Sequence, residues 1–176
     1  MKDAFLEFET ERLLIRPTNF DDAPFLLLLL NTPKWLEFIG DRKVYDLPAS
    51  RNYIKERIIP QFYKWGFGNY TLIRKMDKIP IGCCGLYDRP GVDGIDLGFA
   101  LMPAFEKYGY ALEAAQKMLE IATDIFKLNK VSAITSTENM ASQNLLRKLG
   151  MKYQGLLSIS DEDDPVLLFQ LSKIIS

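Results

Sequence analysis

The chain has 176 residues, 48% apolar and 26% charged, a composition typical of one globular domain with a full hydrophobic core. Its 22 basic and 23 acidic residues nearly cancel, so no broad basic field points to a nucleic-acid or membrane partner. The chain contains no histidine, which excludes Ser-His and Cys-His nucleophile–base pairs and imidazole metal ligands.

The N-terminus lacks an apolar stretch long enough for a signal peptide, and the longest apolar run, 25–30, is too short to span a bilayer. Cys83 and Cys84 are adjacent and make poor partners for a disulfide scaffold, so we interpret them as buried small hydrophobic residues. We therefore expect a single domain over residues 1–176, located in the cytoplasm, with no metal site.

The first part of the chain predicts one strand followed by two helices. A proline closes the strand, and Thr18 or Asp21 can cap the first helix. The second helix must bend or pause at Pro60, because proline has no N–H for the helical hydrogen bonds. The expected elements are a strand at 8–16 and helices at 18–33 and 49–66.

The rest of the chain predicts strands that alternate with two further helices. Apolar positions three and four apart indicate a long amphipathic helix, and Gly150 suits the C-terminal cap of the last helix. The order is that of a mixed α/β domain whose middle strands should pair as antiparallel hairpins. The expected elements are strands at 70–74, 79–87, 95–102, 130–136, 153–160 and 166–171, and helices at 109–127 and 139–149.

A short loop containing Gly109 joins the strand that stops at Pro103 to the long helix. A helix start offers unpaired N–H groups and the positive end of the helix dipole, a combination that binds phosphate. Gly109 lets a ligand approach the backbone closely, and Lys107 could add a positive charge. On these residues alone, an ordinary loop and helix start is the simpler interpretation.

The wider sequence changes that interpretation. The stretch 106–111 (Glu-Lys-Tyr-Gly-Tyr-Ala) resembles the acetyl-CoA motif Gln/Arg-x-x-Gly-x-Gly/Ala of the GNAT (general N-acetyltransferase) superfamily, with Glu106 as a departure. Further blocks, in the same order, resemble the branch typified by ribosomal-protein N-acetyltransferases. These blocks are 9–17, 66–68 with 81–86, 96–99 and 139–151, so the resemblance spans essentially the whole chain.

The resemblance implies an α/β fold of the α+β type, with a mixed, mostly antiparallel sheet of six or seven strands flanked by about four helices. In that family the strand ending near Met102 and the strand starting near Lys130 splay apart, and the pantetheine arm of acetyl-CoA lies in the gap. The residues that the resemblance assigns to acetyl-CoA are Phe99, Ala100, Leu101, Lys107, Tyr108, Gly109, Tyr110, Ala111 and Asn139. For Asn139, a helix N-cap is an equally adequate role.

The resemblance also implies direct attack of a neutral amine on the thioester, without an acyl-enzyme. Asp96 matches the acidic strand position of the family and is our candidate base, acting through water; a solvated edge carboxylate is the alternative. A backbone N–H near Leu101 would stabilise the oxyanion. Ser142 is the candidate donor to the departing thiolate, because Leu146 occupies the position where many members of the family have tyrosine.

The acceptor is expected to be a primary amine, on a small molecule or at a protein N-terminus, and the protein a monomer or a homodimer. Trp35, Trp65 and Phe67 flank the loops expected to form the acceptor pocket, although packing would explain them too. The acidic turn 161–164 is either solvated or attractive to a cationic substrate. The alternative to an enzyme is a catalytically degenerate module of the same fold that binds CoA as a sensor or interaction module. A Walker or Rossmann nucleotide site is excluded, because neither glycine pattern occurs.

Overall fold

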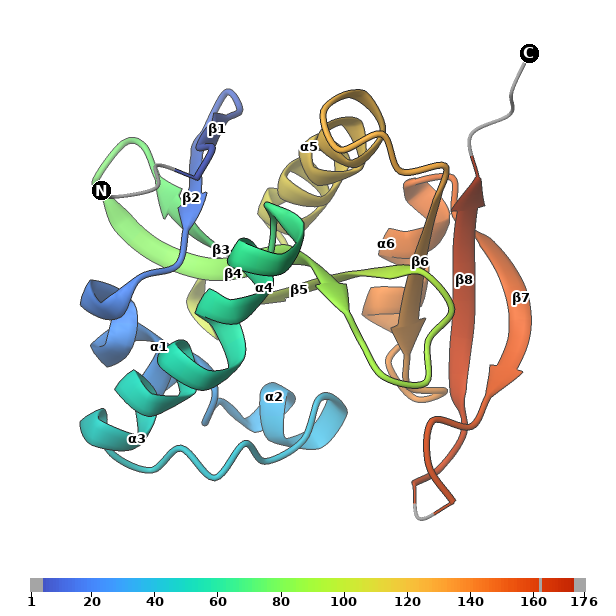
Figure 1. Cartoon of the computed structure of the whole chain (residues 1–176), viewed down its shortest axis with the longest axis horizontal. Helices are drawn as coiled ribbons and strands as arrows, with labels where there is room; N and C mark the ends of the chain where they lie inside the picture. The colour runs from blue at the N-terminus through green and yellow to red at the C-terminus, as the bar shows by residue number, and fades with distance from the viewer. Residues whose placement is uncertain (1–4, 162, 173–176) are drawn as a thin grey trace.

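A computed structural model describes residues 5–161 and 163–172, and one sheet organises nearly all of them (Figure 1). The strand order is β1-β2-β3-β4-β5-β6-β8-β7, and every neighbouring pair is antiparallel except β5 with β6. The mixed, mostly antiparallel sheet predicted from the sequence is thereby confirmed. The strands are β1 (Phe8–Glu9), β2 (Leu13–Pro17), β3 (Asn69–Arg74), β4 (Ile79–Asp88), β5 (Ile95–Leu101), β6 (Lys130–Thr135), β7 (Lys152–Leu157) and β8 (Val166–Ser172).

The described residues form eight strands, one or two more than expected, because the predicted strand at 8–16 folds back on itself. The Thr10 N–H donates to the Leu13 carbonyl at 2.9 Å, and the Leu13 N–H donates to Thr10 Oγ1 at 3.0 Å. These two bonds close a hairpin turn between β1 and β2. The apolar residues Leu13, Leu14 and Ile15 predict extended backbone correctly, but they do not reveal a turn stabilised by one hydroxyl.

The helical segments lie mostly where the sequence places them, with one addition. The expected helix at 49–66 is continuous: α3 and α4 are joined by a π-helical stretch, η2, that accommodates Pro60. The helix α2 is unexpected. It begins at Pro33, where the sequence predicts a helix end, because proline is also favoured at the first helical position. The helical segments are η1 (Phe20–Asp22), α1 (Ala23–Leu29), α2 (Pro33–Phe38), α3 (Leu47–Tyr53), η2 (Ile54–Ile58), α4 (Ile59–Trp65), η3 (Pro103–Phe105), α5 (Tyr110–Asp124) and α6 (Met140–Lys148).

In Figure 1, α1, α2 and α3 lie together below the strands of the N-terminal half, whereas α5 lies above them. The apolar face of α5 packs against β4 and β5 and buries Ala114, Ala115, Met118 and Ala122. The two cysteines of β4 are buried and free, and burial raises the pKa of Cys83 to about 12, as suits packing residues. Within the described ranges, no helix is both long and apolar enough to cross a bilayer.

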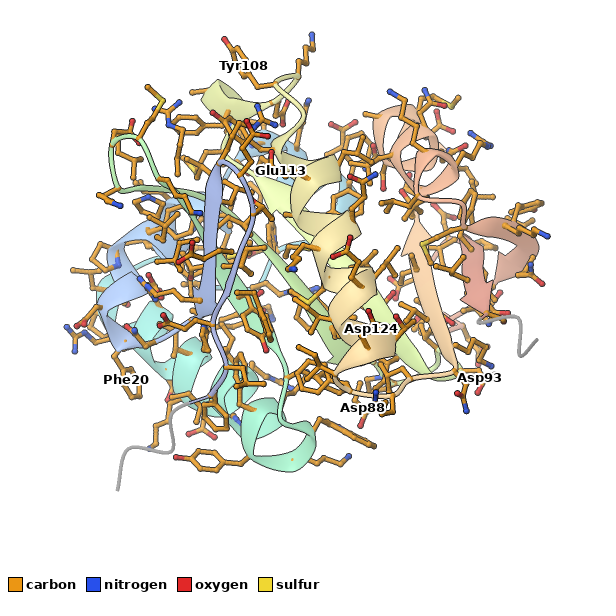
Figure 2. All side chains as sticks on the ribbon, turned by 90° about the horizontal axis from the view of Figure 1, so that it is seen from above. Phe20, Asp88, Asp93, Tyr108, Glu113 and Asp124 are labelled. Carbon is orange, nitrogen blue, oxygen red and sulfur yellow. The ribbon has the colours of Figure 1, made fainter. Side chains whose placement is uncertain are left out.

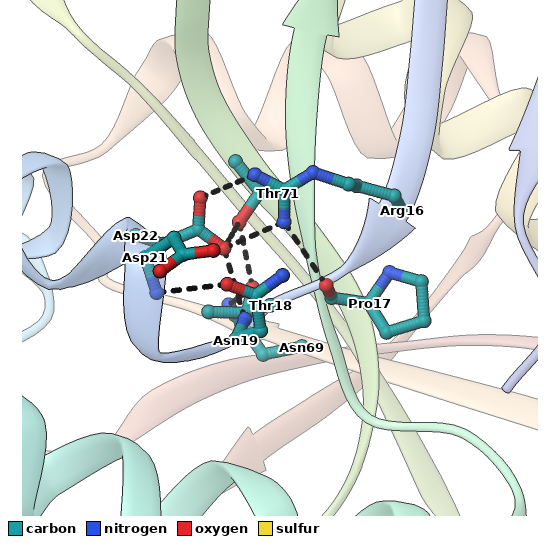
Figure 3. Close-up of polar contacts among 8 residues, drawn as sticks. All are labelled: Arg16, Pro17, Thr18, Asn19, Asp21, Asp22, Asn69 and Thr71. Carbon is teal, nitrogen blue, oxygen red and sulfur yellow. Dashed lines mark hydrogen bonds and ion pairs between the residues drawn. The ribbon is translucent and has the colours of Figure 1, made fainter. Parts of the chain in front are cut away.

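A buried polar cluster fixes the passage from β2 into α1 (Figure 3). The Arg16 guanidinium donates to both carboxylate oxygens of Asp22, at 2.8 and 2.7 Å, and this hydrogen bonding to Asp22 raises the pKa of Arg16. Asp22 Oδ2 also accepts from the Asn19 N–H at 2.9 Å and from Thr71 Oγ1 at 3.1 Å. Because its charges and hydrogen bonds are matched internally, we assign this cluster to folding rather than to chemistry.

The parallel pair β5–β6 divides the sheet. Only Ile95 and Asp96 of β5 pair with β6, opposite Val131 and Ser132, although β5 continues to Leu101 and β6 to Thr135. Beyond Asp96 the two strands part. The splay expected between these strands is confirmed, and it leaves one edge of β5 open toward the start of α5.

Candidate active site

The start of α5 presents unpaired backbone donors. Gly109 is the N-cap with φ of 84°, and the first helical hydrogen bond runs from the Glu113 N–H to the Gly109 carbonyl at 3.0 Å. The N–H groups of Tyr110, Ala111 and Leu112 therefore have no intrahelical partner, and no side chain caps them. Such a helix start attracts anions, and the unpaired donors expected there from the sequence are present.

The loop that precedes α5 is exposed and contains a second left-handed residue, Lys107, with φ of 68°. Glu106, the departure from the family motif, forms an ion pair with Lys34 of α2. The negative charge of Glu106 is thus balanced by the ammonium of Lys34, a pairing that the sequence does not predict.

The open edge of β5 continues from this loop. The Met102 N–H donates to the Ile81 carbonyl of β4 at 2.8 Å, and Ala100 faces Cys83 in the same register. Because backbone groups alternate in direction along a strand, Ala100 turns its N–H and C=O toward β4. Phe99 and Leu101 turn theirs to the open side, where no described strand pairs with them. Among the three strand residues predicted to bind acetyl-CoA, only Phe99 and Leu101 therefore have backbone groups on the open side of β5.

Asp96 lies where β5 and β6 begin to part, and its surroundings differ from the solvated edge considered above. The residue is 1% exposed, and its Oδ2 accepts from Arg89 Nε at 2.6 Å. Its Oδ1 is buried and has no hydrogen-bond partner among the described residues. Burial raises the pKa of Asp96 to about 6, although the charge and hydrogen bond of Arg89 act in the opposite direction.

The helix α6 follows β6, the second strand of the splay, and packs against it. Asn139 is the N-cap of α6, and its side-chain oxygen accepts from the Ser142 N–H at 3.1 Å. The cap alternative considered for Asn139 is therefore the role that the structure displays. Ser142 is half-buried, and its hydroxyl makes no hydrogen bond within the described residues. Leu146, at the position of the family tyrosine, is 1% exposed and belongs to the core.

The residues proposed for the acceptor loops are mainly packing residues. Phe67 is buried and stacks on Trp65, with ring centroids 6.2 Å apart, and Trp35 packs against the core. Asp163 in the acidic turn accepts a hydrogen bond from Ser160, and the described residues of this turn are exposed; Glu162 lies outside the described residues. No cluster of three or more potential metal-ligating side chains occurs within the described ranges.

Three charged residues near this region are not predicted from the sequence: Arg12, which donates to Glu113 of α5, Lys34 and Arg89. Arg12 belongs to the block 9–17 that resembles the family. Its place in that motif is a signal for a role, which the resemblance leaves unassigned. Lys34 lies on the unpredicted helix α2, and Arg89 lies in a turn, where a charged residue is ordinary. Their partners lie far away in sequence or on another strand, which local patterns do not specify.

Comparison with known proteins agrees with this architecture. The family model described as an acetyltransferase (GNAT) domain matches residues 12–152. The chain is 29% identical over 99 residues to the uncharacterised N-acetyltransferase YjdG of Bacillus subtilis (strain 168), covering 56% of this chain and 59% of that protein. It is 28% identical over 150 residues to the uncharacterised N-acetyltransferase p20 of Bacillus licheniformis, covering 84% of this chain and 83% of that protein.

Among solved structures, the chain is similar to RimL, a ribosomal L7/L12 α-N-protein acetyltransferase solved in complex with coenzyme A. The two superpose with a TM-score of 0.80, covering 95% of this chain and 98% of the other, at 14% sequence identity. At that identity the likeness establishes a shared fold.

Proposed function

Because the chain belongs to the acetyltransferase (GNAT) family, as an N-acetyltransferase, we propose that it transfers an acetyl group from acetyl-CoA to a primary amine. The acceptor is a small-molecule amine or a protein N-terminus. The observation that carries the proposal is that the N–H groups at the start of α5 and the open edge of β5 adjoin one another. Acetyl-CoA supplies the activated thioester, and the chain supplies binding, orientation and proton transfer.

The residues present suit two parts of acetyl-CoA, the pyrophosphate and the pantetheine arm. Lys107, Tyr108 and Gly109, with the N–H groups of Tyr110 and Ala111, would hold the pyrophosphate at the positive end of α5. The backbone of Phe99 and Leu101 would pair with the amide groups of the pantetheine arm as a further strand would. Asn139 keeps its side-chain nitrogen for the same arm, since its oxygen caps α6.

Proton transfer would fall to two side chains on opposite sides of the splay. Asp96 is held by Arg89 through one oxygen, which leaves Oδ1 to accept a proton from the amine through water. Ser142 would donate to the departing thiolate, which needs only modest help because a thiol has a pKa of about 8.5. The Leu101 N–H would stabilise the oxyanion of the tetrahedral intermediate.

The acceptor class follows from the cost of neutralising the amine. At pH 7 a lysine amine needs about 4–5 kcal/mol to lose its proton, and an α-amine only about 1–1.5 kcal/mol. A base with a pKa near 6 suits the smaller task, so we favour an α-amine over a lysine side chain.

The test is an assay of the purified chain with acetyl-CoA and a panel of amines: peptides with free N-termini, amino acids, polyamines and lysine side chains on N-terminally blocked peptides. Thiol release and the mass of the product are measured together. Acetylation of at least one amine, with α-amines preferred, supports the proposal. Binding of CoA without transfer to any amine would instead favour the sensor alternative. Absence of both CoA binding and acetyl transfer would overturn the proposed function.

A further inference from the structure

The opening motif of the chain has no part in the proposed function, yet two of its residues contact the start of α5. Thr10 Oγ1 donates to Glu113 Oε1 at 2.6 Å, and the Arg12 N–H donates to the same oxygen at 2.9 Å. Arg12 Nε donates to Glu113 Oε2 at 2.6 Å. The hairpin between β1 and β2 is therefore fastened to the first turn of α5 through one carboxylate; Figure 2 shows Glu113 at this end of the helix and Tyr108 just beyond it.

The side chain of Arg12 also contacts the loop itself. Its Nη1 donates to the Tyr108 carbonyl at 2.9 Å, and its guanidinium lies 4.3 Å from the centroid of the Tyr110 ring. Its Nη2 lies beside Gly109, at 3.4 Å from the position that a Cβ there would occupy. One guanidinium thus touches three consecutive residues of the loop and helix start.

The loop has little else to hold it. Its backbone hydrogen bonds stop at Glu106, whose N–H donates to the Pro103 carbonyl at 3.3 Å, and resume at Glu113. In between, Lys107 and Gly109 have left-handed backbones and Tyr108 is 66% exposed. Ordering a flexible loop costs conformational entropy, so a loop that is already ordered binds a ligand more tightly.

The charge of Glu113 gives Arg12 a second task. Burial raises the pKa of Glu113, but hydrogen bonds from Thr10 and Arg12 and the charge of Arg12 outweigh it and lower the pKa overall. Glu113 is therefore an anion at the first turn of a helix whose start would receive phosphates. Arg12 balances this anion, and Nη2 has no hydrogen-bond partner among the described residues, so it remains free to donate to a phosphate.

We propose that Arg12 is a positioning residue of the acetyl-CoA site: it holds the loop at 107–109 in its phosphate-binding conformation and balances the charge of Glu113. This inference rests on the proposed function, because it assumes that the loop binds acetyl-CoA. It gives the arginine of the opening motif a role in donor binding, separate from the folding role of Arg16 in the same motif.

The test compares the full-length protein with four variants: Arg12→Ala, Arg12→Lys, Arg12→Ala with Glu113→Gln, and Lys64→Ala as a control. Lys64 pairs with Asp88, which Figure 2 places at the opposite end of α5 from Glu113. Calorimetry with CoA gives Kd, and steady-state assays give kcat and KM for both substrates. Arg12→Ala should raise Kd for CoA and KM for acetyl-CoA about tenfold, with kcat and the acceptor KM nearly unchanged.

The other variants separate the two tasks of Arg12. Arg12→Lys should bind CoA with intermediate affinity, since an ammonium keeps the charge but cannot bridge Tyr108 and Glu113. Adding Glu113→Gln to Arg12→Ala should recover part of the loss, and no recovery would contradict the charge-balancing task. Lys64→Ala should leave Kd unchanged. A merely structural role would lower the melting temperature without this selective rise in the acetyl-CoA KM.

The outcomes distinguish this inference from the proposed function. If the unsubstituted protein binds CoA and Arg12→Ala binds it equally well, the inference is overturned while the proposed function stands. If the unsubstituted protein does not bind CoA, both are overturned. Should Arg12→Ala fail to fold, Arg12→Lys decides, because unchanged affinity in that variant also contradicts the bridging contacts.

Discussion

Asp96 is a buried carboxyl of β5, and its proton affinity decides whether it can act as the proposed base. The residue is buried, one of its oxygens is bound by Arg89, and the other is unpartnered where β5 and β6 separate. The neighbours across β4 and β6 are Tyr87 and Ser132, neither of which is charged at neutral pH. Arg89 therefore has the main electrostatic influence on the proton affinity of this carboxyl.

The pH dependence of catalysis tests the role of Asp96. A base acts when ionised, so kcat/KM should be present above the pKa of about 6 and be lost as the pH falls through it. Replacing Arg89 with leucine removes a cation that lowers this pKa, so the acid limb should move to higher pH; Arg89→Lys should move it less. An Asp96→Asn variant with an unchanged rate and pH profile would retire Asp96 as the base.

Ser142 allows a cleaner substitution than Asp96. The N-cap of α6 uses the backbone N–H of Ser142 and not its hydroxyl, so Ser142→Ala should keep the fold. If the hydroxyl protonates the thiolate, kcat should fall about tenfold, measured as thiol release under saturating substrates. Asn139→Ala is the matched control for the cap and should lower stability by about 1 kcal/mol. Full turnover in Ser142→Ala would remove this residue from the mechanism.

At the scale of elements, the helix α2 is the main addition to what the sequence indicates. It is short and begins at Pro33, and it brings Lys34 to Glu106 on the loop before α5. The acidic residue Glu106, where the family motif has Gln or Arg, is therefore accompanied by the compensating positive charge of Lys34. An acidic residue beside a phosphate site is tolerable when a cation is fixed next to it.

The Lys34–Glu106 pair predicts opposite effects for its two members. Glu106→Gln removes an anion, restores the residue of the family motif and leaves Lys34 unpaired, so CoA should bind more tightly. Lys34→Ala leaves Glu106 unbalanced, so CoA should bind more weakly. Because the pair is partly exposed, each change in Kd should be no more than about fivefold and should shrink at high salt. Calorimetry at two ionic strengths checks both, and effects of the same sign would contradict the compensation.

At the scale of the whole molecule, the sheet consists of two parts joined by a short parallel pairing. The strands β1 to β5 support α5 and its loop, and β6, β8 and β7 accompany α6. The proposed donor site uses mainly residues of the first part, while Asn139 and Ser142 come from the second. The site therefore exists only when both parts fold and the splay between them stays open.

Hydrogen exchange should detect the open edge directly. The N–H groups of Phe99 and Leu101 face away from β4, so they should exchange rapidly in the free protein and slow by about tenfold or more on addition of CoA. The N–H of Ala100 faces β4 and should be protected in both states, which makes it an internal control. Equal protection of all three amides without CoA would show that the edge is already paired.

The sequence alone predicted the order of most elements, the family and the position of the loop that we propose binds phosphate. These features are local: apolar spacing sets helices and strands, and a glycine before an amphipathic helix gives an anion-binding start. The ends of the predicted elements differ from the observed ones by a few residues; the β1–β2 hairpin, α2 and the single turn η3 are not predicted. The absence of histidine likewise restricted the chemistry from the beginning.

Only the tertiary structure decided the electrostatics of the site. The burial of Asp96 against Arg89, the pairing of Glu106 with Lys34 and the contacts of Arg12 with Glu113 each join different elements. A charged residue has the same local pattern whether solvent or an opposite charge surrounds it, so no spacing rule identifies its partner. The register of the sheet and the packing of α2 and α5 bring these groups within hydrogen-bonding distance, and that proximity sets their charges and their roles.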